Sequence, residues 1–96
     1  MIFLIKYDII IIVNKKERFI MYITVQFKDK NKVFKGRTYD YKLNSSEKVP
    51  NKETIIRMMD NNYNWIANGT RVKVIDIKKY STTATQEIKY IEDTID

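Results

Sequence analysis

Basic and aromatic side chains alternate between residues 33 and 43, in a segment whose pattern is typical of a β-strand. Lys35, Arg37, Tyr39 and Tyr41 lie two residues apart, so they share one face of that strand. Lysine and arginine pair with phosphates while tyrosine rings stack on bases, and small barrels hold single-stranded nucleic acid in this way. Two residues of a later hairpin would extend this surface. The predicted nucleic-acid-binding residues are Lys35, Arg37, Tyr39, Tyr41, Arg71 and Lys73.

The direction in which this stripe faces has two interpretations. If Val33 marks the inward face, the tyrosines belong to the core and the basic residues lie at its rim. If Phe34 marks the inward face, Arg37, Tyr39 and Tyr41 form an exposed stripe. The net charge of +6 favours a polyanionic partner, although the same charge is also typical of an ordinary solvated surface.

Most catalytic and metal-binding side chains are missing from the chain. It contains no cysteine and no histidine, which excludes thiolate chemistry, the usual general base near neutral pH and the commonest metal ligand. Ser45 and Lys48 match a Ser-x-x-Lys motif, but they fall in a polar loop rather than at a helix start. The two glycines are isolated, and the carboxylates show no metal-site spacing. We therefore expect a protein that is not an enzyme and that binds neither metal nor cofactor.

Alternating and β-branched segments predict the strands that carry these residues. Residues 21–27 and 33–43 flank a polar turn and predict a β-hairpin. Residues 44–53 form the longest loop. Residues 54–59 fit either a strand or a short helix, with the strand favoured by their β-branched start. Residues 86–91 predict a last short strand or a helical turn.

The strongest local signal is Asn68-Gly69, because a two-residue type I′ turn requires positive φ at both positions. Apolar residues on both sides predict a hairpin, in which Tyr63, Trp65 and Ala67 lead into the turn and Val72 and Val74 lead out. Five or six short strands in 96 residues predict an all-β fold, or a β-rich fold with one short helix. The expected architecture is a small antiparallel barrel or sandwich of SH3-like or OB-like size.

The first twenty residues raise a separate question about the domain boundary. We expect one domain over 1–96, with its core in 21–91. The run Ile9–Val13 predicts either an appended strand or a translated leader, because Lys16-Glu17-Arg18 can be encoded by a ribosome-binding sequence suitably placed before Met21. The apolar stretch 1–13 is shorter than a membrane span of about 20 residues and lacks the order of a signal peptide. We expect a protein of the bacterial cytoplasm, without membrane association.

The chain resembles small uncharacterised β-rich proteins of phages and prophages from low-GC Gram-positive bacteria. The resemblance covers residues 21–79 and rests on size, composition and strand-turn order. It is carried by Phe27, Tyr39-Asp40-Tyr41, Ile55-Ile56-Arg57 and the stretch from Asn68 to Val74. It implies a phage origin and a bacterial host cell.

That origin motivates an alternative function, in which the protein binds and inhibits a host protein such as a defence nuclease or replication factor. Methionine and aromatic side chains are enriched at the centres of protein interfaces. The candidate anchors for a host protein are Met58, Met59, Tyr63 and Trp65.

Overall fold

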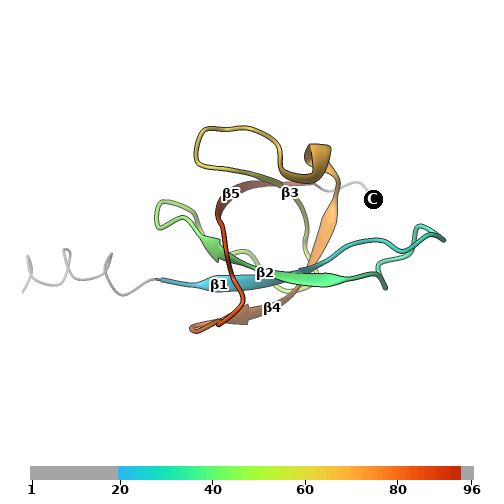
Figure 1. Ribbon diagram of the computed structural model, residues 1–96, viewed down its shortest axis with the longest axis horizontal. Helices are drawn as coiled ribbons and strands as arrows, with labels where there is room; N and C mark the ends of the chain where they lie inside the picture. The colour runs from blue at the N-terminus through green and yellow to red at the C-terminus, as the bar shows by residue number, and fades with distance from the viewer. Residues whose placement is uncertain (1–19, 94–96) are drawn as a thin grey trace, which may run out of the picture.

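Five short strands close into a barrel in the computed structural model, which describes residues 20–93 (Figure 1). The order around the barrel is β1-β2-β5-β3-β4, and β4 returns to β1. The predicted all-β class and small barrel are confirmed. Within the described residues, no helix has the length and apolar character needed to cross a membrane. The elements are β1 (Tyr22–Gln26), β2 (Thr38–Leu43), β3 (Ile55–Met59), the 3-10 turn η1 (Ile66–Gly69), β4 (Val72–Lys78) and β5 (Glu87–Glu92).

Among the described residues, the barrel is antiparallel, as predicted, except at one strand pair. β5 lies parallel to β2 and pairs with it only at Lys42↔Glu87 and Leu43↔Ile88. The other pairs, β1–β2, β1–β4, β3–β4 and β3–β5, are antiparallel. Residues 79–86 connect β4 to β5 and contact Asp40 on the way. This connection lets the last strand enter beside β2 instead of beside β4.

The core consists of the inward-facing residues of all five strands. Because successive side chains in a strand point to opposite faces, alternate apolar residues turn to one side. Ile23 and Val25 of β1 and Ile56 and Met58 of β3 are fully buried, for example. Half-buried Phe27, Tyr41, Ile66, Ile77 and Tyr90 pack against this cluster. The buried apolar residues are Ile23, Val25, Leu43, Ile56, Met58, Val72, Val74 and Ile88.

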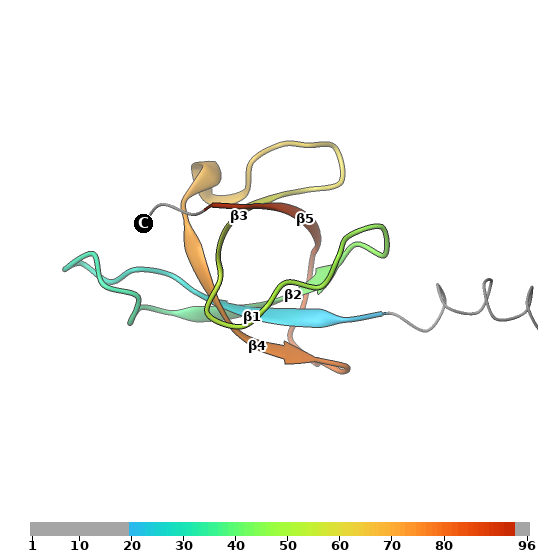
Figure 2. The same ribbon diagram turned by 180° about the vertical axis from the view of Figure 1, so that it is seen from behind.

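The predicted hairpin over residues 21–43 is present, but its second strand begins later than expected. β2 starts at Thr38, and residues 27–37 form an arm that extends away from the barrel (Figures 1 and 2). Asp29 prevents an earlier start because its Oδ1 accepts hydrogen bonds from the backbone N–H groups of Asn31 and Val33. Lys32 has a φ of 64°, which also ends the extended conformation. The segment from Val33 to Arg37 therefore belongs to the arm and not to a strand.

The two-residue hairpin predicted at Asn68-Gly69 is wrong, although the local conformation was anticipated correctly. Asn68 and Gly69 both have positive φ, but so does Ala67, and residues 66–69 form η1 instead of a tight turn. Trp65 forms a β-bridge with Met59 of β3, so residues 63–67 do not pair with β4. β4 pairs with β1 and β3. Three consecutive residues with positive φ widen the turn into a loop.

The remaining expectations concern residues 54–59, the last segment and the residues before β1. Residues 55–59 form a strand, as favoured over the helix, because Ile56 and Met58 face inward while their neighbours face outward. The last segment is also a strand, β5. The expectation that Ile9–Val13 is an appended strand or part of a translated leader lies outside the described residues.

Candidate functional site

Positive charge is concentrated in the arm formed by residues 27–37. The arm carries five basic residues and one acidic residue, a net charge of +4, whereas all of residues 20–93 carry 14 basic and nine acidic residues, a net charge of +5. None of the five basic side chains pairs with a carboxylate in the part of the chain that the structure describes. Their charges are therefore not neutralised locally. The five are Lys28, Lys30, Lys32, Lys35 and Arg37.

The arm is held in one shape by its own backbone. Gly36 N–H donates to the Phe27 carbonyl oxygen at 2.9 Å, and Phe27 N–H donates to the Arg37 carbonyl oxygen at 2.9 Å. Two ammonium groups lie over the Phe34 ring, with Lys28 Nζ 5.0 Å and Lys73 Nζ 5.8 Å from the ring centroid. Because Lys73 belongs to β4, this contact fastens the arm to the barrel.

Aromatic side chains mark the place where the arm joins β2. Phe27 and Tyr39 meet edge to face, with ring centroids 5.6 Å apart. Arg37 Nη1 lies 3.5 Å from the Tyr39 hydroxyl oxygen. The Tyr39 side chain remains 43% exposed. A stacking surface therefore lies directly beside a guanidinium group.

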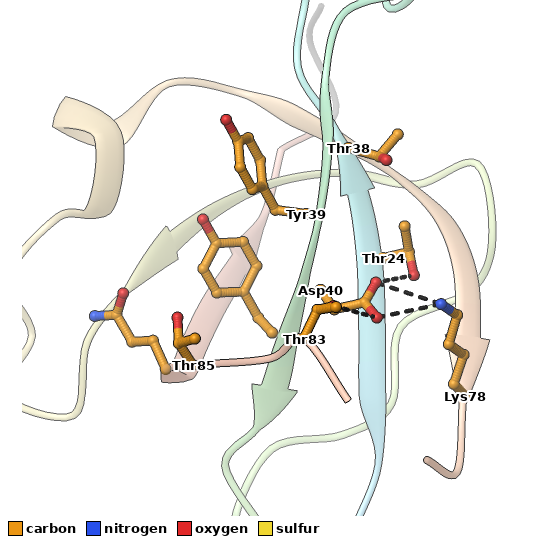
Figure 3. A pocket seen from close by; sticks show the side chains of 9 residues that line it. Thr24, Thr38, Tyr39, Asp40, Lys78, Thr83 and Thr85 are labelled. Atoms are coloured by element: carbon orange, nitrogen blue, oxygen red, sulfur yellow. Dashed lines mark hydrogen bonds and ion pairs between the residues drawn. The ribbon is translucent and has the colours of Figure 1, made fainter. Parts of the chain in front are cut away.

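A cleft of about 620 Å³ begins at Tyr39 and follows one edge of β2. Thr38 to Tyr41 pair with β1 on one side only, because the pairing with β5 starts at Lys42. The opposite wall comes from the β4–β5 connection. Figure 3 shows the Tyr39 ring on one side of β2 and the Asp40 carboxylate on the other. The cleft is lined by Thr24, Thr38, Tyr39, Asp40, Tyr41, Lys78, Thr83, Thr85 and Gln86.

Asp40 fixes the position of the cleft's opposite wall. Its carboxylate accepts hydrogen bonds from Thr24 Oγ1 at 2.5 Å and from Lys78 Nζ at 3.2 Å (Figure 3). It also accepts one from Ser81 Oγ at 2.7 Å. Burial of this side chain, which is 10% exposed, raises its pKa. The hydrogen bonds and the charge of Lys78 lower it further than burial raises it, so that the pKa falls to about 2. Asp40 is thus a charged anchor for the connection.

The residues predicted to bind nucleic acid separate into two groups. Lys35 and Arg37 lie in the arm, and Arg37 contacts Tyr39 at its base. Tyr41 lies opposite Ile23 and packs against the core, which agrees with the interpretation that places the tyrosines on the inward face. Arg71 and Lys73 form ion pairs with carboxylates. Arg71 Nε is 2.7 Å from Asp93 Oδ2, and Lys73 Nζ is 3.2 Å from Glu53 Oε1.

The four candidate anchors for a host protein differ in how far they are buried. Met58 is fully buried in the core, so it cannot contact a partner while the barrel is closed. Met59 is half-buried, and Tyr63 and Trp65 are 66% and 45% exposed. Arg57 stacks on the Trp65 ring with its Cζ atom 4.6 Å from the ring centroid. Gly69 packs close to the Trp65 ring, because a Cβ added at Gly69 would lie 3.2 Å from Trp65 Cδ2.

Sequence reasoning missed two parts of this site. Lys28, Lys30 and Lys32 were assigned to a polar turn, although their density, together with Lys35 and Arg37, was a signal for an electropositive arm. Thr83 and Thr85 were not placed in any predicted strand, and Gln86 was assigned to a short terminal element. No local signal places these residues beside β2, because that contact depends on the parallel entry of β5.

The fold and the site together define a small five-stranded β-barrel with a basic arm and an adjacent polar cleft. No protein-family model matches the chain, and neither the curated proteins nor the solved structures yield a significant match. Within residues 20–93, no group of three acidic side chains is placed to hold a metal ion.

Proposed function

We propose that this protein is a small non-enzymatic module that binds single-stranded nucleic acid through its basic arm. The observation that carries the proposal is the net charge of +4 on residues 27–37 without carboxylate partners among the described residues. Phosphates would pair with Lys30, Lys35 and Arg37, and the exposed Tyr39 ring would stack on a base. A flexible single strand can follow a short curved arm and present both groups to it, unlike a stiff duplex.

A salt titration with arm variants tests this proposal. A labelled decathymidylate is titrated with the protein at two salt concentrations, and binding is followed by fluorescence polarisation. Affinity is expected to fall steeply with salt, because each neutralised phosphate of a single strand releases about 0.7 counterions. The double variant Lys30→Gln and Lys35→Gln should lower the affinity and reduce the salt dependence by about 1.4 in the logarithmic slope.

The β2–β3 connection offers a matched control with the same change in charge. Lys48 and Lys52 are both exposed there, and Lys52 pairs with Asp76 at 3.6 Å. Lys48→Gln with Lys52→Gln should reduce affinity much less than the arm variant. Absence of binding at low salt removes the proposal, and an equal loss in the two double variants would show that only the total charge matters.

A second candidate function is inhibition of a host protein, with the exposed rings of Tyr63 and Trp65 as anchors. It rests on these rings and on the resemblance to phage proteins, which also motivates the proposed phage origin. A pull-down from nuclease-treated bacterial lysate tests it. A single stoichiometric protein that is retained by the parent chain and lost with Tyr63→Ala would support this function, whereas retention of nucleic acid alone in untreated lysate favours the first.

A further inference from the structure

We infer that the cleft beside β2 binds one uncharged base of the strand whose phosphates lie on the arm. This inference rests on the proposed nucleic-acid function and adds a base-binding role to it. The cleft and the arm share Tyr39, which lines the first and contacts Arg37 of the second. A strand held by the arm would therefore bring a neighbouring base to the mouth of the cleft.

The backbone of β2 provides groups that can hydrogen-bond the edge of a base. The Arg37 carbonyl oxygen accepts from Phe27 N–H, and Leu43 N–H donates to the Met21 carbonyl oxygen, so both residues bond to the residues that flank β1. The N–H groups of Lys42 and Asn44 point to the other side and donate to the carbonyl oxygens of Gln86 and Ile88. By the alternation of an antiparallel strand, Thr38 and Asp40 direct their N–H and C=O groups to the cleft side as well. Each of the two thus presents a donor and an acceptor. The edge of a base also carries a hydrogen-bond donor beside an acceptor, and these can pair with the backbone acceptor and donor.

The electrostatic character of the cleft differs from that of the arm. Asp40 and Lys78 are the charged residues of its lining, and they neutralise each other in an ion pair of 3.2 Å. The other lining residues are threonines, tyrosines and Gln86, which offer hydroxyl and amide groups without net charge. Such a surface suits a neutral polar ring better than a phosphate. The separation of a neutral cleft from a positive arm corresponds to the separation of base and phosphate within a nucleotide.

The boundaries of the cleft favour a base over an extended peptide. A peptide that adds to a strand edge needs a continuous run of free backbone groups. Here the pairing of Lys42 with Gln86 closes the edge after Tyr41, and the connection is bonded to Asp40 through Ser81 and Thr83. Only a short stretch of four residues remains. The cleft has a volume of about 620 Å³, which has room for a planar base with its sugar.

A comparison of two probes with equal phosphate charge tests the inference. Decathymidylate and an abasic decamer are titrated against the parent protein, Tyr39→Ala and Gln86→Ala. The parent should bind decathymidylate roughly tenfold more tightly than the abasic decamer, because loss of one stacked base typically costs such a factor. The preference should shrink with both variants. Tyr80→Ala is the matched control, since Tyr80 is 74% exposed and lies outside the cleft lining, and it should keep the preference.

The outcomes separate the two proposals. Equal, salt-dependent binding of both probes would overturn the base site and the stacking on Tyr39 while leaving the phosphate contacts of the arm intact. Absence of binding to either probe would remove both proposals. Direct occupancy is checked by the amide NMR shifts of Thr38, Asp40 and the Gln86 side chain on addition of thymidine monophosphate. Shifts at these groups support the inference. Shifts caused by a short extended peptide, but not by the nucleotide, would overturn it.

Discussion

The Ser81 hydroxyl donates a 2.7 Å hydrogen bond to the carboxylate of Asp40, a residue 41 positions earlier in the chain. This bond fastens the β4–β5 connection, which leads into β5, to β2. Thr24 of β1 and Lys78 of β4 bond to the same carboxylate. One side chain thus joins three strands and a connection.

Replacement of Asp40 should destabilise the barrel more than replacement of an exposed acidic residue. Asp40→Asn converts an acceptor for Ser81 and Lys78 into a group with a donor amide, so we expect a loss of about 1–3 kcal/mol in the free energy of unfolding. Glu53→Gln is the matched control, because its side chain is 71% exposed and its pair with Lys73 contributes about 0–1 kcal/mol. Urea denaturation measures both variants. Equal losses would contradict the anchoring role of Asp40.

Acid should weaken the barrel through the same carboxylate. The pKa of Asp40 is about 2 in the folded protein and 3.8 without the fold. Because the folded pKa is the lower one, its contribution to stability is complete above pH 3.8 and is lost as the pH falls toward 2. Urea midpoints between pH 7 and pH 2 should therefore decrease more for the parent than for Asp40→Asn. A constant difference between the two proteins over this range would exclude the mechanism.

A methyl group at Gly36 should damage the arm. An added Cβ would lie 2.8 Å from the Phe27 carbonyl oxygen and 2.9 Å from that of Lys28, and both are backbone atoms that cannot rotate away. We expect Gly36→Ala to cost about 1–3 kcal/mol, in the range typical of overpacking. Lys35→Ala, at the exposed neighbouring residue, should stay within about 0.5 kcal/mol. Chemical denaturation of the two variants decides whether the backbone approach at Gly36 is as close as described.

Gly69→Ala should disturb the packing of the single tryptophan. Gly69 has a φ of 74°, which disfavours alanine, and the new Cβ would lie 3.2 Å from the Trp65 ring. We expect a loss of about 1 kcal/mol or more and a shift in tryptophan emission as the ring moves away from Arg57. Asn68→Gly keeps the positive φ and adds no atoms, so its emission should match that of the parent protein. Unchanged emission in Gly69→Ala would show that the ring is not held in this position.

Only part of the candidate site could be predicted from the sequence. Arg37 and Tyr39 were anticipated because their spacing places them on one strand face, and they do lie together at the base of the arm. Tyr41 could not be assigned to the core or to the surface, since alternation shows which residues share a face and not which face is inward. The register Ile23↔Tyr41 resolves this point. The hydrogen bond from Arg71 to Asp93 joins residues 22 positions apart, so the local sequence pattern does not predict it.

The sequence by itself determined the local features of this protein. Alternation predicted the strands around Ile23 and Val25, the preference of Asn68 and Gly69 for positive φ was correct, and the composition defined a basic surface without histidine or cysteine. Only the tertiary structure decided that Trp65 pairs with Met59, that β5 lies parallel to β2, and that Asp40 meets Ser81. Local preferences depend on each residue and its neighbours. Strand order depends on which long-range pairings bury the most apolar surface together, and that choice belongs to the whole chain.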